Sequence, residues 1–215
     1  MLKRVRVGLI DSGVGGAPAA AVVATRVLTA AGDSIGHGGQ IASCILQHCS
    51  SAELVVAQVF GRTREASIDA VVEGMHWLVD QGVQIINMSF GTASPSTRLA
   101  NACRAAARTG VVLVASAPAR GGVAFPAALE ECLAVSGDAR CAPGEVSWLA
   151  TSSADFGTHP FCDPQRPDRA GGASMAAGRM SGLLAGLLEA GSEADDVRTE
   201  LQRRAAYVGP ERRHA

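Results

Sequence analysis

Hydrophobic residues fall into short, nearly continuous runs that alternate with longer segments of helical periodicity. The apolar runs cover residues 5–10, 53–60, 83–90, 111–117 and 132–136. Helical spacing of apolar positions covers residues 38–49, 65–81, 97–109, 174–189 and 193–206. Apolar strands that alternate with helices are typical of a mostly parallel sheet with helices on both faces. The pattern therefore predicts an α/β fold with three layers.

The chain contains no internal repeat and no low-complexity linker. Its least regular stretch is residues 142–173, which carries four prolines and is predicted to be a long loop rather than a domain boundary. We therefore expect a single domain over residues 1–208, followed by a short tail of mixed charge at 209–215.

Composition limits the class of function. Hydrophobic residues make up 47% of the chain and charged residues 18%, which is enough to bury a core and argues against disorder. The 19 basic and 20 acidic residues give a net charge of −1, so nothing indicates a nucleic-acid or membrane-surface binder. Aromatic residues reach only 4% against 25 glycines, which favours close backbone packing over an aromatic binding platform.

Cysteine usage and the N-terminus point to the cytoplasm. The first residues lack the apolar core of a signal peptide, and no segment reaches the roughly 18 apolar residues of a membrane span. Without a secretory signal, the six cysteines are expected to be reduced thiols, and they lack the CxxC spacing of zinc sites. A disulfide such as Cys132–Cys141 is the alternative.

Three short motifs place reactive side chains where predicted elements meet. Asp11 follows the first strand, His37 stands between two glycines where a helix begins, and Ser174 opens the helix at 174–189. Each motif alone is ordinary, because Asp-Ser-Gly is a common turn and serine is a common helix N-cap. Ligands of parallel sheets bind at the carboxyl ends of the strands, which is where we expect Asp11 to lie.

Taken together, in the order Asp, His, Ser, these motifs resemble the subtilisin-like serine proteases, the subtilase family. The resemblance covers about residues 5–188 and is carried by four blocks: VGLIDSG at 7–13, DSIGHG at 33–38, IINMSFG at 85–91 and GASMA at 172–176. It implies a subtilisin-like fold and a serine endopeptidase that acts through an acyl-enzyme. In that reading Ser174 is the nucleophile, His37 the general base and Asp11 the residue that orients His37.

The resemblance also implies how a substrate is held. Ser89, Phe90 and Gly91 are expected to bind the substrate as an added strand, with Phe90 lining a side-chain subsite. The backbone N–H of Ser174 is expected to donate to the oxyanion. Glycines beside the three reactive residues and at Gly91 are expected to let a peptide backbone approach.

The chain departs from the family pattern at several positions. Ala119 stands where the family supplies an oxyanion-hole asparagine, so the second donor is open between Ser116, Arg120 and a loop N–H. Ala177-Gly178-Arg179 replaces the usual Ser-Pro-His, and Gln40 replaces a second histidine. No loop has calcium-ligand spacing, and few residues precede Asp11. We therefore expect an enzyme without metal, cofactor or propeptide.

The small size resembles that of subtilases that remove leader peptides, so the expected partner is a peptide or protein substrate, including a modified precursor. A catalytically impaired subtilase fold that binds a peptide is the main alternative, and an esterase using the same triad is another. The remaining histidines, His48, His76, His159 and His214, are expected at the surface or satisfied in the core. We expect Asp33 to serve a loop or helix cap.

A dinucleotide-binding loop is the weakest alternative. Gly13, Gly15 and Gly16 follow a strand, but they lack the GxGxxG spacing and an acidic partner.

Overall fold

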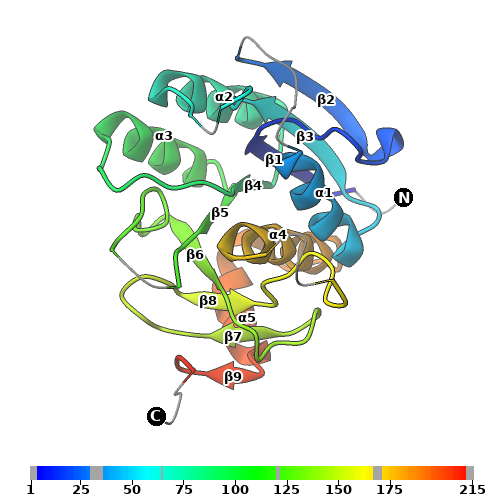
Figure 1. Cartoon of the computed structure of the whole chain (residues 1–215), viewed down its shortest axis with the longest axis vertical. Coiled ribbons are helices and arrows are strands. Elements are labelled where there is room, and N and C mark those ends of the chain that lie inside the picture. Colours follow the sequence, from blue (N-terminus) through cyan, green and yellow to red (C-terminus); the bar gives the residue numbers. More distant parts are fainter. Residues whose placement is uncertain (1–3, 30–35, 64, 120–121, 167–170, 212–215) are drawn as a thin grey trace.

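Nine strands form one sheet in the computed structural model of the chain, which describes residues 4–29, 36–63, 65–119, 122–166 and 171–211. The strands are β1 (Arg6–Asp11), β2 (Val22–Val27), β3 (Glu53–Gln58), β4 (Ile85–Met88), β5 (Val112–Ser116), β6 (Cys132–Gly137), β7 (Val146–Trp148), β8 (Phe156–Thr158) and β9 (Tyr207–Val208). Their order in the sheet is β2-β3-β1-β4-β5-β6-β8-β7-β9, which Figure 1 shows from β2 near the top to β9 at the bottom. All neighbours are parallel except β7 and β8.

In the ranges that the structure describes, five helices cover the sheet: α1 (His37–His48), α2 (Ile68–Asp80), α3 (Thr97–Ala107), α4 (Ala173–Glu189) and α5 (Val197–Arg204). Two short 3-10 turns, η1 (Ala19–Ala21) and η2 (Ala194–Asp196), complete the elements. Side chains Ser67 and Ser96 cap α2 and α3 by accepting the N–H groups of Ala70 and Leu99. In Figure 1, α2 and α3 lie side by side, and so do α1 and α4.

The predicted strands and helices are all present, with ends shifted by a few residues. The prediction of a long loop at 142–173 is wrong, because β7 and β8 lie within it. Each of these strands has only three residues, too few to show a period. Strand β2 was also missed because it is an edge strand and most of its residues are exposed, so it lacks a continuous apolar run.

Alternation along each strand divides the core into two faces. Val7 and Leu9 of β1 point toward α1, α4 and α5, which we call the α1–α4 face. Ile10 points the other way, toward α2 and α3, the α2–α3 face. Gly8 also points there, and a Cβ atom at this position would lie 3.0 Å from Leu78 of α2. Alternate residues along a strand therefore belong to opposite faces, and the position of a residue in this alternation decides against which pair of helices it packs.

Helices α1 and α4 pack in parallel with glycines at the contact. A Cβ on Gly178 would lie 3.1 Å from Ile41, and one on Gly182 would lie 2.5 Å from the carbonyl oxygen of Ile45. From the first contact to the second, the chain advances by four residues on each helix, which is about one helical turn. Extending this register by one more turn toward the N-termini leads to Ser174 on α4 and His37 on α1, so we expect these two residues to lie near each other.

The six cysteines are all free thiols. The alternative of a Cys132–Cys141 disulfide is therefore wrong. Cys132 instead forms a hydrogen bond with Cys103 of α3, and this bond, together with burial, raises the pKa of Cys132. In the described part of the chain, no helix is both long and apolar enough to cross a membrane.

Candidate active site

Asp11 and His37 form a buried carboxylate–imidazole pair. Asp11 ends β1 with the same parity as Val7 and Leu9, so its side chain points to the α1–α4 face, where it is 2% exposed. Its two carboxylate oxygens lie 2.9 and 3.0 Å from Nδ1 of His37. The backbone N–H of Ser12 donates to Oδ1 at 2.7 Å. Because a carboxylate only accepts, this contact assigns the proton to Nδ1 of His37.

Glycines bring the end of β1 and the start of α1 into backbone contact. Gly36 has φ 68°, which suits glycine, and it precedes the first helical residue, His37. A Cβ on Gly38 would lie 1.8 Å from the carbonyl oxygen of Gly13, and one on Gly39 would lie 2.3 Å from that of Gly15. The expectation that the glycine after His37 makes room for a substrate is therefore wrong: its close neighbour is the protein's own chain.

Ser174 lies in the first turn of α4 and is tied to the end of β4. Its hydroxyl donates to the carbonyl oxygen of Ser89 at 3.1 Å, and the Ser89 hydroxyl donates to the carbonyl of Ser174 at 3.2 Å. Gly172, the N-cap, has φ 107°. The first-turn N–H groups of a helix have no acceptor within the helix, so the N–H of Ser174 is suited to bind an anion.

Two further polar residues extend this connection into the core, and the sequence analysis missed them. Asn87 of β4 is fully buried and donates from Nδ2 to the Ser89 hydroxyl at 2.9 Å. Its Oδ1 accepts from the hydroxyl of Ser181 on α4 at 3.1 Å. An asparagine within the apolar run 83–90 was the available signal, because a buried amide needs partners.

The segment after β4 lies beside the chain near Phe125. The ring of Phe90 meets Phe60 edge-on with centroids 5.6 Å apart, while Thr92 and Phe125 form an antiparallel bridge. A Cβ on Gly91 would lie 3.2 Å from that of Ala124. Gly91 therefore allows these two segments to approach each other closely.

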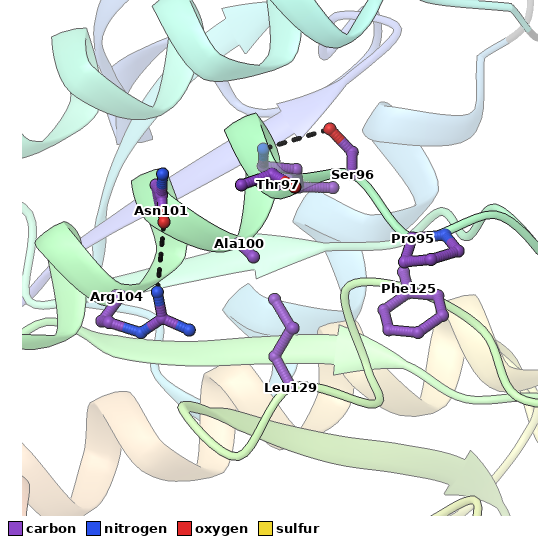
Figure 2. Close-up of a pocket in the computed structure, with 9 residues that line it drawn as sticks. Pro95, Ser96, Thr97, Ala100, Asn101, Arg104, Phe125 and Leu129 are labelled. Atoms are coloured by element: carbon purple, nitrogen blue, oxygen red, sulfur yellow. Dashed lines mark hydrogen bonds between the residues drawn. The ribbon is translucent and has the colours of Figure 1, made fainter.

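A mostly apolar pocket of about 270 Å³ adjoins this bridge (Figure 2). It lies between the first turns of α3 and the chain around Phe125 and Leu129, with Asn101 and Arg104 at one end and Pro95 at the other. None of its lining residues belongs to the pair Asp11 and His37 or to Ser174. The candidate site is thus defined by hydrogen-bond geometry rather than by this pocket.

The residues considered for a second oxyanion donor lie at and after the end of β5. The pairing of Met88 with Ala115 sets Ser116 beside Ser89, and Ser116 is buried. Ala119 is exposed, and Arg120 lies outside the described residues.

The other histidines take structural positions where the structure describes them. His48 accepts from Nη1 of Arg179 at 2.6 Å, and burial followed by the charge of Arg179 lowers its pKa from 6.5 to about 4. His159 contacts the carbonyl oxygen of Cys141 through Nδ1 at 2.8 Å, and His76 is exposed. His214 and Asp33 lie outside the described residues.

Within the described ranges, no three His, Cys, Asp or Glu side chains gather as a metal site.

Comparison with known proteins assigns the family. The profile of the Subtilase family matches residues 14–213, most of the chain. The chain belongs to the subtilase family. The matched range begins after Asp11, so the place of this residue in the site rests on its contact with His37 and on the VGLIDSG block.

Among curated subtilases, Subtilisin Savinase from Lederbergia lenta is 31% identical over 114 residues, covering 48% of this chain and 42% of the relative. A thermostable alkaline protease from Halalkalibacterium halodurans is 30% identical over 146 residues, covering 61% and 40%. The chain thus spans less than half the length of these relatives.

Solved structures support the fold. A lanthipeptide protease superimposes with a TM-score of 0.73 at 19% identity, covering 94% of this chain and 80% of the other. A serine-to-alanine mutant of the protease domain of PatA gives 0.69 at 22% identity, covering 96% and 92%. The predicted subtilisin-like fold is confirmed.

Proposed function

We propose that this subtilase is a serine endopeptidase that cleaves peptide bonds through Asp11, His37 and Ser174. The observation that carries the proposal is the buried contact between both oxygens of Asp11 and Nδ1 of His37. The register of α1 against α4, extended by one turn, supports Ser174 as the third residue. A carboxylate, an imidazole and a hydroxyl in this order are the parts of a catalytic triad.

The chemistry follows from these side chains. With Nδ1 of His37 held by Asp11, the opposite nitrogen, Nε2, accepts the Ser174 proton as the hydroxyl attacks the scissile carbonyl. Asp11 stabilises the imidazolium that forms. His37 then returns the proton to the leaving amine, and water hydrolyses the acyl-enzyme. The first-turn N–H of Ser174 donates to the oxyanion.

In this mechanism the substrate also releases the nucleophile. The Ser174 hydroxyl now donates to the carbonyl of Ser89, the same carbonyl that we assign to a backbone N–H of a substrate bound along Ser89, Phe90 and Gly91. A substrate N–H that takes this carbonyl leaves the hydroxyl to His37. Binding of an extended peptide and activation of Ser174 are thereby coupled.

We assign the substrate to the class of peptide precursors that carry a leader segment. The likeness in fold to a lanthipeptide protease and to the protease domain of PatA supports this assignment. Maturation of the small subunit of quinohemoprotein amine dehydrogenase is the specific role that we propose within this class. Six free cysteines are consistent with our assignment to the cytoplasm. The proposed reaction uses no cofactor.

One observation favours a second function. Ala119 stands where subtilases supply an oxyanion-hole asparagine, a donor whose loss costs roughly 100- to 1000-fold in turnover. A subtilase fold without this donor could bind a peptide and not cleave it. The complete set of Asp11, His37 and Ser174 favours the enzyme.

Labelling with a fluorophosphonate separates the two functions. We expect the intact chain to react covalently at Ser174, with loss of fluoride, and Ser174→Ala to show no labelling and a fall in peptide cleavage of roughly 10⁶-fold. Ser43→Ala is the matched control, because Ser43 only bonds a carbonyl within α1. An unlabelled intact chain would overturn the protease in favour of the binding module.

Mass spectrometry of a precursor peptide encoded beside this gene, with and without the protein, tests the substrate class. A single cleavage that frees the leader supports it. Turnover of simple esters without peptide cleavage would instead indicate an esterase.

A further inference from the structure

A buried guanidinium lies close to Ser174 on the same helix. Arg179 follows Ser174 by five positions on α4, is 0% exposed and is the largest fully buried side chain among the described residues. The groups whose charge affects its pKa, among the described residues, are Cys44 and Cys162, and no carboxylate is among them. Burying a guanidinium without a carboxylate partner is costly, so an apolar side chain would fill this space at lower cost.

All five N–H donors of Arg179 are nevertheless used. Nε donates to the carbonyl of His159 at 3.3 Å, and Nη2 donates to those of Phe161 at 2.7 Å and Cys162 at 3.3 Å. Nη1 donates to His48 at 2.6 Å and to the carbonyl of Pro143 at 3.4 Å. Three of the five bonds thus hold one short segment, residues 159–162.

That segment in turn holds the chain just before Ser174. The carbonyl of Pro160 accepts the N–H of Gly172 at 2.9 Å, and Phe161 forms an antiparallel bridge with Gly171. A Cβ on Gly171 would lie 2.6 Å from the ring of Phe161, so the two strands of chain are in tight contact. Gly172, with φ 107°, is the N-cap whose conformation sets the direction of the Ser174 N–H.

From this geometry we infer that Arg179 is a positioning residue for the reaction. It fixes residues 159–162, these fix Gly171 and Gly172, and Gly172 fixes the hydroxyl and N–H of Ser174. The inference rests on the proposed function. It gives the costly buried charge a reason, because a planar group with five donors can hold several carbonyls at once, which an apolar side chain cannot.

The rate of fluorophosphonate labelling, separated from its endpoint, tests the inference. The endpoint counts folded chains, whereas the rate reports how well Ser174 is placed. We expect Arg179→Met to label roughly 100-fold more slowly and Arg179→Lys about tenfold more slowly, with endpoints unchanged, because small misplacements of a reacting group have effects of this size. A merely structural Arg179 would lower the endpoint and leave the rate.

Arg140→Met is the matched control. Its guanidinium is partly buried and, like that of Arg179, joins separate parts of the chain, here Asp138 and the carbonyl of Gly209, but among the described residues it makes no hydrogen bond to residues 159–162. We expect Arg140→Met to label at the unaltered rate. Labelling of Arg179→Lys at that same rate would overturn the inference, including where Arg179→Met does not fold.

Amide hydrogen exchange gives a readout independent of activity. Arg179→Lys should speed exchange at residues 171–174, and Arg140→Met should not. Unchanged exchange at residues 171–174 would also overturn the inference. An intact chain that resists labelling but shows this change in exchange would contradict the proposed protease and leave the structural link from Arg179 to Ser174 standing.

Discussion

The two faces of the sheet are built from the same strands but by different means. On the α2–α3 face, aliphatic side chains such as Ile10, Ile86 and Met88 pack against the helices. The α1–α4 face buries polar groups among its aliphatic ones: Asp11, Asn87, Ser89, Thr158, Arg179 and Ser181. Each of these makes at least one hydrogen bond that joins two elements or holds a loop.

The difference shows how one strand serves stability and chemistry together. In β4, Ile86 and Met88 face the apolar side, while Asn87 faces α4 and is followed with the same parity by Ser89. Substitutions of the buried aliphatic residues on the α2–α3 face should therefore change stability alone. Substitutions on the α1–α4 face should change stability and the reactivity of Ser174 together.

The largest effect is expected from an alanine at the contact between α1 and α4, compared with an alanine on α2. Gly182→Ala would push a methyl group to 2.5 Å from the carbonyl oxygen of Ile45, so α1 and α4 must separate. We expect a loss of about 3 kcal/mol in the free energy of unfolding, and slower fluorophosphonate labelling because His37 and Ser174 move apart.

Gly74→Ala on α2 is the control for this pair. Its methyl group would meet only side chains, at 3.1 to 3.4 Å, and alanine is the better helix former, so we expect a change within about 1 kcal/mol. Urea unfolding of both variants measures the contrast. Equal losses in the free energy of unfolding would contradict the expectation that the packing around Gly182 is tighter than the packing around Gly74.

A smaller effect is expected from neighbouring residues of β4. Asn87→Ala leaves the hydroxyls of Ser89 and Ser181 without a partner amide, which should cost about 2 kcal/mol and slow labelling of Ser174. Met88→Leu, one residue on and on the other face, should cost less than about 1.5 kcal/mol and leave labelling unchanged. Labelling of Asn87→Ala at the unaltered rate would separate this network from the chemistry.

The smallest effect is a dependence of stability on pH. Burial and then Arg179 lower the pKa of His48 from 6.5 to about 4, so between these values the unfolded chain binds the extra proton. The stability that neutral His48 contributes is complete above pH 6.5 and is lost as the pH falls through about 4. Since His48 is only half-buried, we expect a loss of about 1 kcal/mol from this residue.

Urea unfolding at pH 7 and pH 4 measures this loss. His48→Gln keeps an acceptor for Arg179 and should flatten this part of the pH dependence. His76→Gln, on the exposed side of α2, should leave it unaltered. The same pH dependence in both variants would contradict a role for His48.

The type and order of most elements, and the four family blocks, can be read from the amino-acid sequence alone. Long strands and helices can be predicted because burial of one face imposes a period of two residues on a strand and 3.6 residues on a helix. Strands of two or three residues such as β8 and β9 carry no such period, and an exposed edge strand such as β2 lacks a continuous apolar run. Asp11, His37 and Ser174 can be proposed from the sequence because each stands in a motif of its own.

The surroundings of Asp11, His37 and Ser174 depend instead on long-range packing. Gly38 and Gly39 are glycines because the Gly13 and Gly15 carbonyls lie against them, and the partners of Asn87 and Arg179 come from segments up to 131 positions away. No local pattern encodes such contacts, since they depend on how α1, α4 and residues 159–162 pack. The motifs thus indicate the side chains that we propose as reactive, and packing determines how they are held.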